Sequence, residues 1–434
     1  MSEKTNDAAW SRLFAEYHIA ERVAQDGCFA ITAEQIKKVR EPRLMAKFDH
    51  ASALPQPFAE RGLSMLPTRR GSYLIAPMLT FHELESLDTQ EPVPFISRRQ
   101  FDSLSLANIT SEAMALHGAY SWGILQDFTG DAALWPTISG RMGTPAFGFD
   151  IAMRDGKAMH VEVEGAQVEI DAGYEGRDAI YLLEAKMGEQ SDFIVRQLYY
   201  PFRLWSTRVG KPVRTIFLCY SNGLYGLWEY GFEELENYSS IQLLTQRQYQ
   251  VLGPMDESFS AKHLQTLLEQ SCVAEPNDVP FPQADSLNRI ISLCELLYSR
   301  GAPIEKKQLG LEISFKGQQS FALRQVDYYV NAARYLGLVD EFGPSVDLSP
   351  LGERFCTQGS LGLRIRFIAA VVLRHAPFQA AMRLYLRCGM CPSDEQVVSI
   401  LLASPVASRL AASTCRRRAA TVKNWISWIY SRLQ

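Results

Sequence analysis

The chain has 434 residues, 47% hydrophobic and 21% charged, a composition typical of a globular protein with roughly 100–200 residues in each domain. No apolar run approaches the ~20 residues of a membrane helix, and the first ten residues lack the basic and apolar stretches of a signal peptide, so we expect a cytoplasmic protein without membrane contact. Eight Cys are too few for a disulfide framework, and the seven scattered His have no zinc or haem ligand spacing.

The charge is unevenly distributed along the chain. The formal net charge is −4, but the residues from Ser360 to the end contain eleven Lys and Arg against two acidic residues, Asp394 and Glu395, a local charge of +9. A basic segment of this kind is typical of proteins that bind polyanions, although a solvated basic face has the same composition.

Proline-rich stretches divide the chain into three parts. Three Pro fall within 273–286 and two within 88–96, each in a segment with few bulky apolar residues. We therefore expect an N-terminal domain over 1–95, a second domain over 96–272 and a C-terminal region over 285–434. The N-terminal domain contains a basic cluster that is either a DNA-contacting arm or a solvated helix face: Lys37, Lys38, Arg40, Arg43 and Lys47.

The central part alternates between strand and helix patterns. A helical pattern covers 105–126 and stops at Thr129-Gly130-Asp131, and another covers 192–205, where Pro201 should kink or restart the helix. The expected strands are 147–153, 159–165, 167–173, 179–187, 213–221 and 224–232, the last two joined by a hairpin turn at Ser221-Asn222-Gly223. These elements predict an α/β domain with a mixed sheet flanked by helices.

The C-terminal region is mostly helical. Helical patterns cover 287–301 and 318–339, and a short hairpin at 339–352 turns at Gly343-Pro344. This is the element order of a winged helix. A second, all-helical unit is expected over 362–434, so the C-terminal domain is predicted to be all-α or winged-helix in class.

Acidic residues interrupt two consecutive predicted strands. Alternation places Glu169 and Asp171 on one face of strand 167–173, and Glu184 and Lys186 on one face of strand 179–187. A tight connection makes the strands antiparallel neighbours, so these groups should converge at one corner of the sheet. Charges in such apolar strands are costly unless they are paired or bind a metal, and an exposed carboxylate ladder on an edge hairpin is the alternative.

This arrangement suits metal-assisted hydrolysis of a phosphodiester. Two carboxylates and a backbone carbonyl supply hard oxygen ligands for Mg²⁺ and leave room for several of its water molecules. The metal polarises the phosphoryl oxygens and acidifies a bound water, and a nearby ammonium group orients that water.

The run EIDAGYEG followed by LLEAK resembles the PD-(D/E)XK nuclease signature, with Ile170 where the signature has Pro. The flanking segments 111–149 and 192–205 resemble type II restriction endonucleases. The resemblance implies a restriction-endonuclease-like fold with Mg²⁺ as cofactor. It further implies that Asp171, Glu184 and the carbonyl of Ala185 are metal ligands and that Lys186 orients the attacking water.

Three further residues are candidates for the same site. The resemblance implies that Gln197, on the following helix, and Glu112, on the preceding helix, act near the metal, although both also suit a polar helix surface. Glu169 is either a further ligand or a decoy on the same strand face as Asp171.

The last helix is the candidate DNA-binding element. Arg416, Arg417, Arg418 and Lys423 lie near its start, which Ser413-Thr414 would cap, and Trp425, Ile426, Trp428 and Ile429 should face the core. A solvated terminal helix is the alternative.

These features predict a sequence-specific type II restriction endonuclease that hydrolyses double-stranded DNA with Mg²⁺. Cutting both strands of a palindrome requires two active sites, so a homodimer is expected, and the host would need a cognate DNA methyltransferase as functional partner. Two alternatives stay open: a DNA repair or structure-specific nuclease, and a winged-helix DNA-binding regulator with an inactive nuclease fold.

Overall fold

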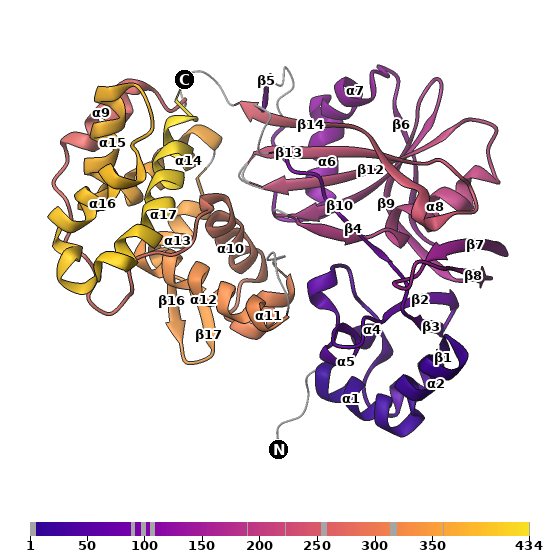
Figure 1. Cartoon of the computed structure of the whole chain (residues 1–434). Coiled ribbons are helices and arrows are strands. Elements are labelled where there is room, and N and C mark those ends of the chain that lie inside the picture. The colour runs from indigo at the N-terminus through magenta and orange to yellow at the C-terminus, as the bar shows by residue number, and fades with distance from the viewer. Residues whose placement is uncertain are drawn as a thin grey trace.

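The computed structural model describes residues 6–87, 92–96, 101–104, 109–188, 190–221, 223–252, 258–312, 319–358 and 360–433. Within these residues the buried hydrophobic side chains form three clusters. One fills the N-terminal unit, one lies on one face of the central sheet, and the third lies on the other face and continues into the C-terminal helices (Figure 1). The chain is therefore a mixed α/β protein, as the sequence predicted.

The N-terminal unit packs short helices against a small sheet of order β1-β3-β2, around the buried rings of Trp10 and Phe58. Its elements are α1 (Asn6–Tyr17), α2 (Ile19–Asp26), β1 (Phe29–Thr32), α3 (Ala33–Lys37), α4 (Pro42–Met45), η1 (Ala51–Ala53), α5 (Gln56–Ala59), β2 (Ser64–Arg69) and β3 (Ser72–Ala76).

The central unit is built on a mixed sheet of seven strands within the described residues, in the order β5-β14-β13-β12-β10-β9-β6. Its strands are β5 (Val93–Ile96), β6 (Trp135–Gly143), β9 (Gln167–Glu175), β10 (Ile180–Met187), β12 (Val213–Ser221), β13 (Leu224–Phe232) and β14 (Ile241–Leu252). The pairs β10–β12 and β14–β5 are parallel, and the other pairs are antiparallel. The sequence patterns predicted four of these strands and missed β5, β6 and β14.

Helices cover both faces of this sheet. α6 (Glu112–Trp122) and α7 (Ile124–Thr129) pack on one face, and α8 (Arg196–Ser206) packs on the other (Figure 1). The remaining elements of the unit are β4 (Phe81–Glu83), which pairs with β11 (Asp192–Ile194), the separate hairpin β7 (Phe147–Ala152) and β8 (Ala158–Val163), and η3 (Tyr238–Ser240). The predicted strands 147–153 and 159–165 thus form a sheet of their own instead of joining the main one.

Two predicted helices differ from the structure. Of the single helix expected over 105–126, residues 105–108 lie outside the described residues, and the observed helix begins only at Glu112, where Ser111 caps it by accepting the Met114 N–H at 3.3 Å. The rest is two helices, because Gly123 adopts a left-handed conformation (φ 96°) that ends α6 and starts α7. In the segment 192–205, the first residues form strand β11. α8 then runs through Pro201 as one element, so of the two predicted effects of this proline, a kink or a restart, the restart is wrong.

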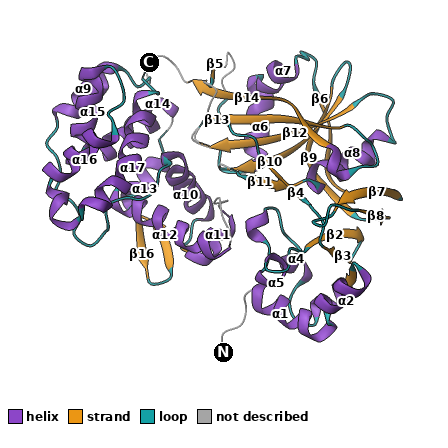
Figure 2. Cartoon of the chain, in the orientation of Figure 1, coloured by secondary structure: helices purple, strands orange, loops and turns teal. Residues whose placement is uncertain are grey.

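The C-terminal part contains a small sheet of order β15-β17-β16 and a group of helices (Figure 2). Its elements are α9 (Ala261–Glu269), α10 (Leu287–Arg300), β15 (Ile304–Glu305), α11 (Lys306–Glu312), α12 (Gln319–Tyr335), β16 (Val339–Phe342), β17 (Ser345–Leu348), α13 (Pro350–Cys356), α14 (Leu361–Leu373), α15 (Ala376–Cys388), α16 (Asp394–Ala403), η5 (Pro405–Arg409) and α17 (Ala412–Tyr430). The predicted hairpin turn is confirmed, because Phe342 pairs with Ser345 across Gly343 (φ 61°).

The segment 273–286 has no helix or strand, as its prolines predicted, but it is packed against the C-terminal helices. Phe281 stacks on Phe378 with ring centroids 5.7 Å apart, and the indole N–H of Trp425 donates to the Ala284 carbonyl at 2.8 Å. This segment is therefore part of the C-terminal core. The eight cysteines all lie in the described residues and none is disulfide-bonded, and no described helix is long and apolar enough to cross a membrane.

Candidate active site

Asp171 and Glu184 face each other where two central strands separate. The antiparallel register of β9 and β10 runs from Ile180↔Glu175 to Leu183↔Ala172, and one step further would place Glu184 opposite Asp171. The ladder stops there, and the Ala185 N–H donates instead to Asp171 Oδ2 at 2.9 Å. A carboxylate thus takes the place of the next ladder bond, and the predicted convergence of these strands is confirmed.

Glu184 lies at the centre of a buried polar group. Its Oε1 accepts from Lys186 Nζ and from Gln197 Nε2, both at 2.5 Å. Only 8% of the Glu184 side chain and 12% of the Lys186 side chain are exposed. Gln197 comes from the start of α8, so the sheet and the helix that covers it both contribute to this group.

The charges in this group shift one another's ionisation. Burial raises the pKa of Glu184 to about 8, and the negative charge of Asp171 adds to the rise while Lys186 opposes it. Burial alone would lower the pKa of Lys186, but the charges of Glu184, Glu112 and Asp49 outweigh it, so this pKa is raised and the ammonium stays protonated.

Glu112, which the resemblance places near the metal, lies beside Lys186. It is in the first turn of α6, with Oε1 3.9 Å from Lys186 Nζ, and 44% of its side chain is exposed. Partial burial and the charge of Asp171 raise the pKa of Glu112.

Asp49, from the N-terminal unit, lies close enough to Lys186 for their charges to interact, and the sequence analysis did not single it out. Its carboxylate is 17% exposed and pairs with Lys47 at 3.3 Å. Burial would raise the pKa of Asp49, but the positive charges of Lys186, Lys47 and Arg196 outweigh it and lower that pKa. Asp49 lies in no recognisable motif and is far from the other site residues in the chain, so only the packing of two units could reveal it.

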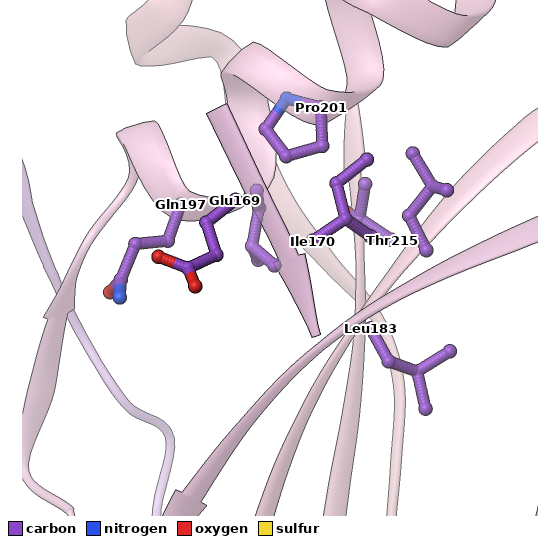
Figure 3. Close-up of a pocket in the computed structure, with 8 residues that line it drawn as sticks. Glu169, Ile170, Leu183, Gln197, Pro201 and Thr215 are labelled. Carbon is purple, nitrogen blue, oxygen red and sulfur yellow. The ribbon is translucent and has the colours of Figure 1, made fainter. Parts of the chain in front are cut away.

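Glu169 does not share the environment of Asp171. Burial alternates from Gln167 to Ile170 and then breaks, because Asp171 and Ala172 are both half-buried where the register between β9 and β6 shifts. Glu169 is 58% exposed and pairs with Arg141 of β6 at 3.1 Å. Its carboxylate lies beside the Gln197 side chain, at a narrow hollow under α8 that has no space for a water molecule (Figure 3).

The donor set fits a hard divalent cation. Oδ2 of Asp171 and Oε1 of Glu184 are engaged by protein donors, which leaves the second oxygen of each carboxylate for a ligand. The N–H and C=O of one residue in an extended strand point to the same side, so the Ala185 carbonyl faces the edge on which Asp171 lies. No three His, Cys, Asp or Glu side chains of the described residues form a metal-binding group, so a site here relies on this carbonyl and on water.

The candidate DNA-binding residues lie on α17. Trp425, Ile426, Trp428 and Ile429 are buried, which confirms the predicted core stripe. The predicted Ser413-Thr414 cap is wrong, because the helix begins at Ala412 after Ala411 and has no side-chain cap.

The basic side chains of α17 differ in their surroundings. Arg416 and Arg417 are exposed, whereas Arg418 is half-buried. Lys423 Nζ is bound to Asp394 Oδ1 at 2.7 Å. The two exposed arginines are therefore the members of this set that are most accessible to a ligand.

The N-terminal basic cluster is largely engaged within its own unit. Lys38 Nζ donates to the Tyr17 hydroxyl at 3.1 Å, and Arg40 donates to the Asn6 side chain at 2.7 Å. Lys47, on the side that faces the site, pairs with Asp49.

Three family models match consecutive parts of the chain, and each is described as a domain of unknown function. DUF6996 matches residues 7–75, DUF6997 matches 76–250 and DUF7226 matches 289–434. A search of curated proteins and a search of solved structures each gave no significant match. Asp171, Glu184 and Lys186 fall in the second match and Asp49 falls in the first, so the candidate site draws on two of the matched families.

Proposed function

We propose that this protein is a Mg²⁺-dependent endonuclease of double-stranded DNA, of the sequence-specific type II restriction kind. The observation that carries the proposal is the pair Asp171 and Glu184, opposed at the point where the β9–β10 ladder ends, with the Lys186 ammonium on Glu184. A restriction-endonuclease-like core of the PD-(D/E)XK kind is the fold that accounts for this placement on a mixed sheet between helices.

In this proposal Asp171, Glu184 and the Ala185 carbonyl would hold Mg²⁺. The bound ion would polarise the phosphoryl oxygens and make a water acidic enough to attack phosphorus. Gln197 fixes the orientation of Glu184 through its amide donor. Lys186 places a positive charge beside the attacked phosphate, where it orients the water and offsets negative charge as it develops. Glu112 helps to hold Lys186 in place.

The C-terminal part is proposed to bind DNA. The order α10, α11, α12 and then the β16–β17 hairpin is that of a winged helix, which supports a role in nucleic-acid binding. Arg416, Arg417 and Arg418 would contact phosphates, with Lys423 available once Asp394 releases it. A homodimer would supply the two active sites needed to cut both strands, and a cognate DNA methyltransferase would protect the host.

Cleavage of unmodified plasmid tests the proposal. Wild-type protein with Mg²⁺ should give discrete fragments, whereas Ca²⁺ should support binding without cutting. Asp171→Ala, Glu184→Ala and Lys186→Ala should each reduce cleavage by about 10³-fold or more while DNA binding is kept, because these groups act as a unit. Glu164→Ala is the matched control for Glu169→Ala. Both carboxylates pair with an arginine, Glu164 with Arg69 at 3.0 Å and Glu169 with Arg141 at 3.1 Å.

The outcomes separate the candidates. Cleavage at junctions or lesions without discrete plasmid fragments would favour a repair or structure-specific nuclease. Ordinary cutting by both Asp171→Ala and Glu184→Ala would refute the site, and DNA binding without any cutting by the wild type would favour a regulator. Loss of cutting in Glu169→Ala but not in Asp171→Ala would assign the metal to the other carboxylate of β9.

A further inference from the structure

Arg418 of α17 is a half-buried cation that has lost water without gaining a partner. Its Nε and Nη1 atoms are buried and have no hydrogen-bond acceptor, and the structure gives Arg418 no ion pair with any described residue. The remaining nitrogen, Nη2, has no hydrogen bond either but is not buried, so it reaches solvent. Unpaired buried donors are costly, so this environment is unfavourable for the unbound protein.

Two other enclosed arginines have an acceptor that Arg418 lacks. Arg364 pairs with Glu295 at 2.9 Å, and Arg374 Nη2 donates to the Leu336 carbonyl at 3.0 Å. Each of them also has a buried Nε without a partner. Arg418 differs because two of its nitrogens are buried and unpaired and no acceptor holds the third.

The surroundings of Arg418 on its helix are well anchored. Arg418, Thr421 and Trp425 lie on one face of α17, because residues three or four positions apart are neighbours on a helix. Thr421 donates to Asp285 Oδ1 at 2.8 Å, and the Trp425 indole N–H donates to the Ala284 carbonyl at 2.8 Å. A carboxylate is thus held at the next turn of the helix, yet it forms no ion pair with Arg418.

A second arginine increases the need for negative charge here. Arg417 is exposed, and its Nη2 donates to the Thr414 hydroxyl at 3.3 Å. Burial, and after it the positive charge of Arg417, lower the pKa of Arg418. An anion at Nη2 of Arg418 would offset both positive charges. It would also cost less desolvation than at an exposed arginine, because this guanidinium has already lost much of its water.

We propose that Arg418 is the anchoring phosphate contact of α17, and that a phosphate group of a nucleic acid approaches Nη2 from solvent and supplies the acceptor that the unbound protein lacks. Phosphate is the expected anion because its oxygens match the forked donors of a guanidinium group. This inference rests on the DNA binding of the proposed function and extends it. It assigns the largest contribution to the least exposed of the three consecutive arginines, and it expects this arginine to destabilise the unbound protein.

Opposite effects on stability and on DNA binding test this role. Arg418→Met keeps an apolar stem and removes the unpaired charge, so the thermal midpoint of the full chain in phosphate-free buffer should rise by about 1–2 °C. The affinity for duplex DNA in Ca²⁺, measured by fluorescence anisotropy at constant salt, should fall about tenfold or more. Arg416→Met should weaken binding by only about threefold, since an exposed guanidinium must first lose its water.

Arg374→Met is the matched control. Arg374 is also half-buried with an unpaired Nε, but the Leu336 carbonyl holds its guanidinium. Its replacement should lower the thermal midpoint and change DNA affinity by less than about twofold. Inorganic phosphate is a second probe: compared with chloride at equal ionic strength, it should raise the thermal midpoint of the wild type but not that of Arg418→Met.

Each outcome supports or overturns one of the two proposals. A lower midpoint for Arg418→Met, or its failure to fold, would show a structural arginine and overturn this inference. Unchanged DNA affinity would overturn it too, and stabilisation by inorganic phosphate would then assign the site to free phosphate. If the wild type cuts DNA in that case, the proposed function stands without this inference. A wild type that binds DNA through Arg418, yet cuts none with Mg²⁺, would overturn the proposed nuclease alone.

Discussion

Glu184 is the most enclosed carboxylate of the candidate site, and its environment opposes its own negative charge. It is 6% exposed as a residue, and Asp171 lies across the strand gap from it. Lys186 and Gln197 both donate to one of its oxygens. These two donors favour the ionised carboxylate, but burial and the charge of Asp171 outweigh them, so without a bound cation Glu184 keeps its proton at pH values where a free glutamic acid is ionised.

This raised pKa makes stability depend on pH in the cation-free protein. The folded chain holds the Glu184 proton up to about pH 8, whereas the unfolded chain releases it near 4.5, so the native state binds more protons between these values. The stability that the raised pKa of Glu184 gives the folded chain is fully present below about pH 4.5 and is lost as the pH rises through about 8. In urea unfolding with EDTA present, the free energy of unfolding of the wild type should fall by on the order of 1–3 kcal/mol relative to that of Glu184→Gln as the pH rises over this range.

The comparison with Glu184→Gln isolates this carboxyl from Glu112, whose raised pKa acts in the same direction and is present in both proteins. A constant difference in the free energy of unfolding between the two proteins from pH 5 to pH 8.5 would contradict the prediction.

At the scale of elements, the site depends on the close approach of three strands. Gly173 of β9 lies between β6 and β10, and a Cβ added there would come within 2.7 Å of Ile138 Cβ and 3.1 Å of Leu182 Cδ2. A larger residue at this position must push β9 away from its neighbours and so displace Asp171, two residues along.

Gly173→Ala should therefore lower the free energy of unfolding by about 1–3 kcal/mol, the usual cost of overpacking, as measured by urea unfolding. Gly143→Ala, on β6, is the control, because an added Cβ there meets nothing within 4 Å and should change stability by less than about 0.5 kcal/mol. Equal stability of the two variants would show that β9 can move without cost.

The exposed arginines of helix α17 lead to a prediction about the salt dependence of DNA binding. If exposed Arg416 and Arg417 contact phosphates, replacing each with Ala should flatten the slope of log K against log salt by about 0.9. Lys423→Ala should change the slope less, because Asp394 already neutralises this ammonium. Fluorescence anisotropy over a salt series measures the slopes, and an unchanged slope in the Arg416→Ala/Arg417→Ala variant would exclude the helix as the phosphate-binding element.

At the scale of the whole molecule, two units contribute to the candidate site and the C-terminal part packs nearby. The N-terminal unit supplies Asp49, and the sheet and its helices supply the remaining carboxylates, Lys186 and Gln197. The C-terminal part packs close to the end of β10, where the hydroxyls of Ser292 on α10 and Ser221 on β12 are 3.0 Å apart.

A homodimer is the expected functional assembly. Sedimentation velocity on protein bound to a short duplex with one recognition site, in Ca²⁺, should give two chains per duplex, because each chain has one candidate site and a palindrome offers two equivalent phosphates. In Mg²⁺ such a complex should cut both strands in one binding event. A single chain on the duplex, with only one strand nicked, would contradict the dimer.

Local patterns in the sequence determined much of the central unit. Period-2 alternation predicted β9, and apolar runs predicted β10, β12 and β13, whose residues are buried on both faces. The predicted hairpin is confirmed by the pairing of Ser221 with Leu224, although Asn222 itself lies outside the described residues. These patterns also placed Asp171, Glu184 and Lys186 together, since they lie on neighbouring strands joined by a short turn. The edge strands β5 and β6 and the internal strand β14 were missed, and the left-handed Gly123 divided a helix that the apolar pattern had joined.

Only the tertiary structure decided the surroundings of these residues. The break of the β9–β10 ladder, which lets Asp171 accept the Ala185 N–H, depends on a shift of register against β6 that no local pattern encodes. The pairing of Lys423 with Asp394 likewise joins residues on separate helices. Asp49 reaches the site because backbone bonds to β11 join two units of the chain. Charges interact through space and not along the sequence, so the electrostatics of the site followed from packing.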